Sequence, residues 1–137
     1  MSLPVRGVVI LGMLGILVGS ILLSQRKTLL PARPADPQLG ERIFRQNCAV
    51  CHGSNAGGSD FAPPLNRMGH ADHHPDWELY MFIAEGKVGF TQMPAWKERL
   101  SDREIRSVIA YIKTLWTKDQ RASQQNINEV RPAPPRE

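Results

Sequence analysis

The hydrophobic and polar positions divide the chain into four parts, and the first of these is almost entirely apolar. Residues 7–23 form a run of 17 residues without a charge, which reaches the lower limit for a helix that spans a membrane. No small-x-small cleavage site follows the run, because Pro31, Arg33 and Pro34 interrupt that pattern. We therefore predict an uncleaved transmembrane anchor over residues 1–30, rather than a cleaved signal peptide, and a proline-rich spacer over residues 31–36.

Helical periodicity marks the next part, residues 37–118. Asp36 and Pro37 suit the N-cap and the first position of a helix that runs towards residue 48. A second helix is predicted from residue 76 to just before Gly86. Ser101 to Glu104 form a capping box that opens a third helix. Its apolar side chains fall on one face: Ile105, Val108, Ile109, Ile112 and Trp116. No stretch alternates with a period of two for long enough to form a sheet, so we predict an all-α domain.

The last part, residues 119–137, is polar, contains three prolines and shows no periodicity. This composition predicts an extended or disordered tail, which would be free to bind a neighbouring subunit.

Charge adds little to this picture except at the amino-terminal flank. The net charge is +4, but residues 36–118 carry ten Lys or Arg against ten Asp or Glu, and the tail carries three against three. The basic excess is therefore confined to the first 35 residues, and we predict no nucleic-acid partner. A domain of about 80 residues has a small core, which a buried cofactor would complete.

The clearest chemical signal is the sequence Cys48-Ala49-Val50-Cys51-His52. A Cys-x-x-Cys-His pattern indicates covalent attachment of a c-type haem, in which two thiols form thioether links and the histidine binds the iron. These are the only two cysteines of the chain. A thioredoxin-like redox pair or half of a zinc site are the alternatives, but neither needs a histidine at that position.

A second axial ligand is expected from the loop that contains Met93. This residue lies 41 positions after His52 and precedes Pro94, so one helix can cross and return on the opposite haem face. A thioether ligand raises the reduction potential, which suits an electron carrier. Two other methionines, Met68 and Met81, are alternative ligands. Three clustered histidines, His70, His73 and His74, could give bis-His ligation or a separate metal site. The last alternative is an open site with no second ligand from the protein. Met81 is expected to be a packed core residue.

Residues 37–117 resemble a mono-haem class I cytochrome c. The likeness rests on the haem motif and on Met93-Pro94-Ala95-Trp96, which is similar to the family's ligand loop. Gly40 and Phe44 match the pair that the family packs against an aromatic residue of its last helix, here Tyr111.

The segment Ala62-Pro63-Pro64-Leu65 is similar to the family's Gly-Pro-x-Leu and departs from it at Ala62. The resemblance implies about three main helices around one haem c and a carbonyl of Pro63 that holds His52. It leaves open whether Trp77, Tyr80 and Trp96 line the haem or belong to the core.

From these residues we predict an electron carrier and not an enzyme, because two axial ligands close the iron. The alternatives are a haem enzyme or gas sensor with a labile sixth site, and a structural subunit whose haem only completes the fold. Measured ligand binding and midpoint potential separate these classes.

The expected location is the cytoplasmic membrane, with one span and the haem domain on the periplasmic, extracytoplasmic side. Arg26 and Lys27 weakly favour the opposite orientation, but haem attachment of this type takes place outside that membrane. The short spacer and the glycine face of the run (Gly12, Gly15 and Gly19) favour a subunit of a respiratory or photosynthetic membrane complex with redox partner proteins. A free-standing tethered shuttle is the alternative.

Overall fold

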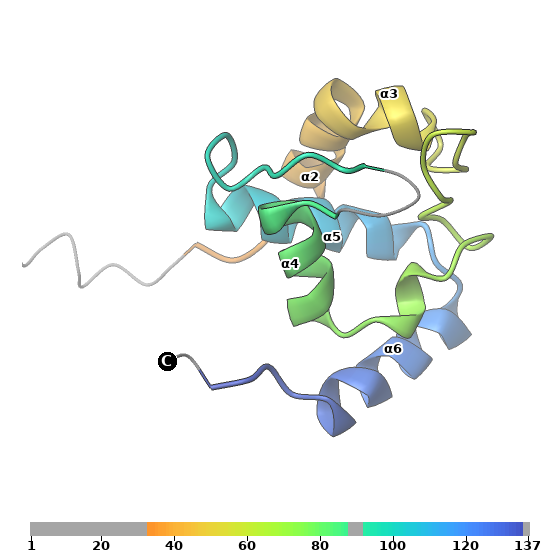
Figure 1. Cartoon of the computed structure of the whole chain (residues 1–137). Helices are drawn as coiled ribbons and strands as arrows, with labels where there is room; N and C mark the ends of the chain where they lie inside the picture. The colour runs from red at the N-terminus through yellow and green to blue at the C-terminus, as the bar shows by residue number, and fades with distance from the viewer. Residues whose placement is uncertain (1–32, 88–91, 136–137) are drawn as a thin grey trace, which may run out of the picture. The chain divides into compact units, whose positions relative to one another are not determined.

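The computed structural model describes residues 33–87 and 92–135, and these residues are mostly helical (Figure 1). The elements in chain order are α2 (Pro37–Ile43), η1 (Phe44–Cys48), α3 (Ala49–His52), η2 (Ala71–His73), α4 (Asp76–Glu85), α5 (Asp102–Thr114) and α6 (Lys118–Val130). Within the described residues the only strand-like feature is one isolated antiparallel bridge, between Lys87 and Met93. The all-α prediction is therefore confirmed for the domain.

The apolar run at residues 7–23 lies outside the described residues. Among the residues that are described, no helix is both long enough and apolar enough to cross a membrane.

The first helical segment changes its winding just before the cysteines. Asp36 caps α2 through a side-chain oxygen that accepts from the Gln38 N–H at 3.0 Å. The helix then widens into one π turn, η1, in which the Ala49 N–H bonds to the Phe44 carbonyl. Such wide turns occur mostly as single insertions in α-helices, often at functional sites. The turn contains both the buried Phe44 and the first cysteine of the motif, Cys48.

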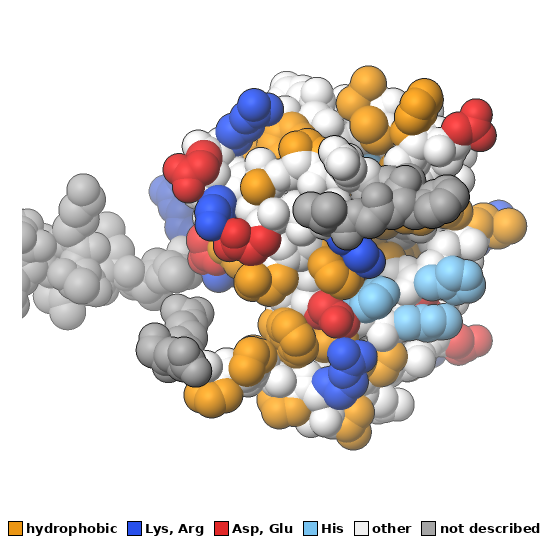
Figure 2. All heavy atoms as spheres, in the orientation of Figure 1, with side chains coloured by type: hydrophobic (Ala, Val, Ile, Leu, Met, Phe, Trp, Pro, Cys, Tyr) orange, Lys and Arg blue, Asp and Glu red, His pale blue; other side chains and the backbone are white. Residues whose placement is uncertain are grey.

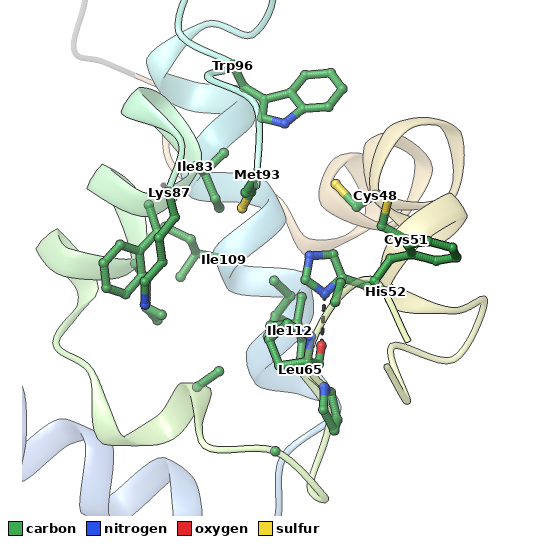
Figure 3. A pocket seen from close by; sticks show the side chains of 18 of the residues that line it. Cys48, Cys51, His52, Leu65, Ile83, Lys87, Met93, Trp96, Ile109 and Ile112 are labelled. Atoms are coloured by element: carbon green, nitrogen blue, oxygen red, sulfur yellow. Dashed lines mark hydrogen bonds between the residues drawn. The ribbon is translucent and has the colours of Figure 1, made fainter. Parts of the chain in front are cut away.

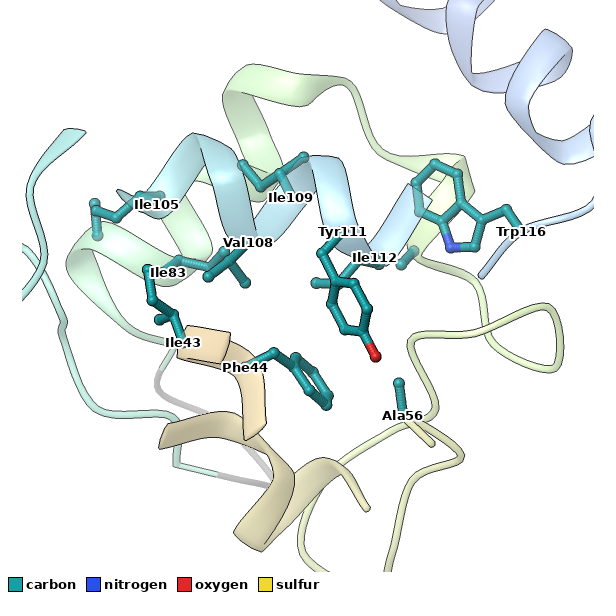
Figure 4. Close-up of a cluster of buried hydrophobic side chains, with 12 residues drawn as sticks. Ile43, Phe44, Ala56, Ile83, Ile105, Val108, Ile109, Tyr111, Ile112 and Trp116 are labelled. Carbon is teal, nitrogen blue, oxygen red and sulfur yellow. The ribbon is translucent and has the colours of Figure 1, made fainter. Parts of the chain in front are cut away.

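The core lies between this first segment and α5 (Figure 4). The capping box of α5 is present as predicted, with Ser101 and Glu104 bonded reciprocally. All five apolar side chains expected on the inner face are buried: Ile105, Val108, Ile109, Ile112 and Trp116. Trp116 lies two residues beyond the end of the helix, and its indole N–H donates to the Leu65 carbonyl at 2.8 Å.

The contact between the first helical segment, α2 with η1, and α5 depends on Gly40, Phe44 and Tyr111. A Cβ atom at Gly40 would overlap the Ser107 carbonyl, so the two backbones approach closely only because this residue is glycine. Phe44 is fully buried, and its ring centroid lies 5.4 Å from that of Tyr111, with the rings tilted by 51°. The pairing implied by the resemblance is therefore present.

Helix α4 begins and ends as predicted. Gly86, with φ of 77°, follows its last residue, and this left-handed conformation favours glycine. Met81 is 43% exposed, so the expectation that it is a packed core residue is wrong.

The prediction of an extended or disordered tail over residues 119–137 is wrong for most of that stretch. Residues 118–130 form α6, which begins with a second capping box between Thr117 and Gln120. Its packed side carries mainly amides, with the half-buried Ile127 beside them, and Gln124 is its one buried residue. A hydrophobic periodicity cannot reveal such a helix, whereas the Thr-x-x-Gln spacing could have done so.

Candidate functional site

A cavity of about 680 Å³ opens beside the cysteine motif (Figure 3). Its walls are mainly apolar and come from α3, α4, α5 and the loops between them. The residues with coordinating or reactive groups that line it are Cys48, Cys51, His52, Met68, His70, His74 and Met93. No carboxylate lines the cavity among the described residues, and Lys87 is the one Lys or Arg that does. Such a chamber accommodates a large, mostly apolar ligand.

His52 is oriented by the chain that follows it. The side chain is only 8% exposed, and Nδ1 lies 2.9 Å from the carbonyl oxygen of Pro63. A carbonyl can only accept, so Nδ1 carries the proton and Nε2 keeps its lone pair for a metal. Figure 3 shows this second nitrogen on the side away from the hydrogen bond, towards the cavity. The predicted contact with Pro63 is therefore present.

The loop after His52 brings Pro63 into this position. The Gly58 N–H bonds to the His52 carbonyl at 2.9 Å, and the Leu65 N–H bonds to the Ala56 carbonyl at 2.8 Å. Ala56 is fully buried with φ of 57°, a conformation that is uncommon for a residue other than glycine. The loop is thus folded back tightly on the histidine.

The two cysteines differ in their surroundings. Cys48 is partly covered and Cys51 is exposed, and both are free thiols at the cavity. Burial, with a smaller contribution from the neighbouring Cys51, raises the pKa of Cys48 to about 11. This direction is the opposite of the lowered pKa that the nucleophile of a thioredoxin-like redox pair needs, so it favours the haem interpretation of Cys48.

Met93 reaches the cavity from the other side (Figure 3). Its backbone is paired with Lys87 by two hydrogen bonds of 3.0 Å. The next turn is fixed by the Trp96 N–H, which bonds to the Ile83 carbonyl at 3.1 Å. A Cβ at Gly86 would crowd the Met93 carbonyl, so this glycine also permits the close return of the chain. Residues 88–91, between the two bridge partners, lie outside the described part.

The alternative methionines are placed less favourably than Met93, whereas two of the three histidines also line the cavity. Met68 lines the cavity but is 73% exposed, and Met81 does not line it. His70 and His74 line it and His73 does not; Figure 2 shows histidine side chains gathered on one face. The Nδ1 of His74 lies 2.9 Å from Glu78, and this hydrogen bond lowers the pKa of that carboxyl. It leaves Nε2 available, as the Pro63 contact does for His52, so bis-His ligation stays the alternative to Met93.

A separate metal site finds no support in the described part of the chain. The rings of His70 and His73 lie with their centroids 5.3 Å apart and are tilted by 37°. No group of three His, Cys, Asp or Glu residues there is arranged to hold a metal ion.

Several lining residues were not singled out from the sequence. Leu79 and Phe82 of α4 and Lys87 after it line the cavity, and the Lys87 ammonium lies 4.3 Å from the centroid of the Phe82 ring. Three aromatic residues were expected either to line the haem or to belong to the core. Of these, Trp96 lines the cavity and Trp77 and Tyr80 do not. Only the apolar spacing of α4 could have suggested Leu79 and Phe82, and it does not distinguish cavity lining from core.

These observations fit a covalently attached haem. The two thiols stand at one side of an apolar chamber, an imidazole presents Nε2 to it, and a thioether enters it from elsewhere in the chain. Histidine with methionine is one of the ligand sets that proteins use for haem iron in electron transfer.

Comparisons with known proteins agree with this geometry. Residues 35–112 match the family model described as cytochrome C oxidase, cbb3-type, subunit III. A cbb3-type cytochrome c oxidase subunit CcoP from Azospirillum brasilense is 35% identical over 104 residues, covering 72% of this chain and 34% of that protein. Cytochrome c6 from Bryopsis maxima is 37% identical over 81 residues, covering 56% of this chain and 89% of that protein.

Among solved structures, cytochrome cL from Methylophaga aminisulfidivorans superimposes with a TM-score of 0.55 at 21% identity, covering 74% of this chain and 68% of that one. This likeness concerns the fold alone. The chain thus spans about a third of the CcoP relative and most of the cytochrome c6.

Proposed function

The chain belongs to the cytochrome c oxidase, cbb3-type, subunit III family, and we propose that it passes single electrons between redox partners through one haem c bound in the cavity. It is an electron-transfer c-type cytochrome, as its relatives are. When bound, the haem supplies a metal that alternates between two oxidation states by one electron.

Each residue of the site has a separate part in holding that group. Cys48 and Cys51 supply the sulfurs of the two thioether links. His52 supplies Nε2 to the iron, and the carbonyl of Pro63 keeps the other ring nitrogen protonated and the ring oriented. Met93 would supply a thioether sulfur to the iron.

The observation that carries the proposal is the convergence of four groups from two distant stretches, residues 48–52 and 93, on one apolar cavity. With His52 and Met93 both holding the iron, the protein would leave no position open for substrate chemistry. The apolar walls and the sulfur ligand both favour the reduced, less charged state of the site.

We further propose that residues 1–30 anchor the chain in the cytoplasmic membrane, with the spacer 31–36 leading to a haem domain on the periplasmic, extracytoplasmic side. The support is the uncharged apolar run and the cbb3-type oxidase relatives, which favour a subunit of a membrane complex. A free-standing tethered carrier is the second candidate, because the match covers 89% of a cytochrome c6.

The ligand assignment is tested by Met93→Ala in the haem-loaded protein. Loss of the thioether should lower the midpoint potential and let cyanide or carbon monoxide bind the iron rapidly, whereas the wild type resists both. Met81→Ala is the matched control, because it removes another methionine that does not line the cavity and is 43% exposed, and it should leave both properties unchanged.

Two results would contradict the proposal. Rapid ligand binding by the wild type would favour an enzyme or gas sensor. If Met93→Ala kept the wild-type midpoint potential and His70→Ala changed it instead, bis-His ligation would be favoured. Purification of the full chain in mild detergent, followed by identification of co-purifying proteins, separates a complex subunit from a tethered carrier that migrates alone.

A further inference from the structure

Helix α6 presents a row of amides, Gln120, Gln124 and Asn128, to the rest of the domain; we call these three residues the amide row. They are spaced by four residues and therefore share one face of the helix. Gln124 is only 2% exposed. Its Nε2 donates to the His74 carbonyl at 3.2 Å and to Asp76 at 2.6 Å, and its Oε1 accepts from Asn128 at 3.2 Å.

The partners of the amide row belong to one stretch, residues 67–78, which we call the wall segment. Gln120 donates to the Arg67 carbonyl at 3.4 Å and to Asp72 at 3.3 Å. Asn128 accepts from the Asp76 N–H at 2.7 Å. In Figure 1, α6 runs beside the short turn η2 and the start of α4.

The end of α6 adds two more contacts to the wall segment. The Trp77 indole N–H donates to the Arg131 carbonyl at 3.0 Å, and the Arg131 guanidinium donates to Glu78 at 3.3 Å. Glu78 in turn contacts the His74 ring, so α6 is connected through Arg131 to a side chain that lines the cavity.

The wall segment needs such support because it contains little regular structure of its own. Before α4 begins, only the three residues of η2 are helical. Yet Met68, His70 and His74 of this segment line the cavity. The amide row itself does not line the cavity, and α6 lies beyond residue 112, where the match to the family model ends.

We propose that the amide row of α6 consists of positioning residues for electron transfer: it holds the wall segment against the bound haem and so excludes water from that side of the site. This inference rests on the proposed function. Water that enters beside the iron stabilises the oxidised state, which carries the larger positive charge, because burial disfavours a charged group. A loosened wall segment should therefore lower the midpoint potential without any change of axial ligand.

The experiment compares Gln124→Ala with Gln125→Ala in the haem-loaded full chain. Gln125 is the exposed neighbour on the same helix, so it matches the change in composition and helix propensity. In Gln124→Ala, amide hydrogen exchange of the wall segment should speed up by about fivefold to 150-fold, the factor that corresponds to loss of a buried hydrogen-bonding group. The amides of α5 should keep their protection, and the midpoint potential should fall. Gln125→Ala should match the wild type in all three.

A second variant keeps the inference testable if Gln124→Ala does not fold. Asn128→Ala removes a less buried member of the row and should give the same changes at smaller size. The inference is overturned if a folded variant of the row keeps the wild-type potential, or if exchange accelerates equally in α5 and the wall segment, which would be global destabilisation. Absence of any reversible redox couple in the wild type would instead contradict the proposed function.

Discussion

The contact between Phe44 and Tyr111 should be among the largest local contributions to the stability of the haem domain. Phe44 has no exposed surface and lies where the first helical segment widens before the cysteines. Phe44→Ala should destabilise the domain by about 3–5 kcal/mol, because it removes a buried ring and leaves a cavity. Phe44→Leu keeps most of the side-chain volume but removes the ring. The resulting loss in free energy of unfolding should therefore include the contribution of about 0.5–1.5 kcal/mol expected for two rings whose centroids are 5.4 Å apart.

A double-mutant cycle isolates that term. The free energy of unfolding is measured in urea for the wild type, Phe44→Leu, Tyr111→Leu and the double variant, with haem absorbance and tryptophan fluorescence as probes. We expect a coupling energy of about 0.5–1.5 kcal/mol. A coupling below about 0.3 kcal/mol, which is the usual error of additivity, would refute the view that the two rings act as a pair.

Two further substitutions test local features of the fold. Ser101→Ala should destabilise the domain by about 1 kcal/mol through loss of the cap. The Ser101 hydrogen bonds lower the pKa of Glu104, so their contribution is present above the ordinary carboxyl pKa and is lost as pH falls through the lowered value. Urea unfolding should therefore show a smaller penalty at about pH 3 than at about pH 7, and an equal penalty at both would contradict this. Ala56→Val should cost about 2–4 kcal/mol, because a β-branched side chain must enter a fully buried site at φ of 57°; a thermal midpoint equal to that of the wild type would exclude strain there.

The helices of the domain were predictable wherever their inner face is apolar or their first turn carries a capping pattern. Asp36 before Pro37 and the Ser101 capping box both mark real starts, since these signals depend on hydrogen bonds within a few residues. Helix α6 has a capping pattern as well, but its inner face is polar. The partners that satisfy Gln124 lie about 50 residues earlier in the chain, and no local pattern contains them.

By itself, the amino-acid sequence indicated the chemistry of this protein: two thiols and an imidazole in the spacing of a c-type haem motif, with few residues that could supply a second ligand. Only the tertiary structure decided which groups meet around the cavity. The Pro63 carbonyl turns back to His52, Met93 enters from the opposite side, Met81 faces outward, and a tail that looks disordered folds onto the cavity wall. The physical reason is distance along the chain. The spacing of the cysteine motif is fixed by residues that are neighbours in the sequence, whereas these contacts join distant segments that only the packed fold brings together.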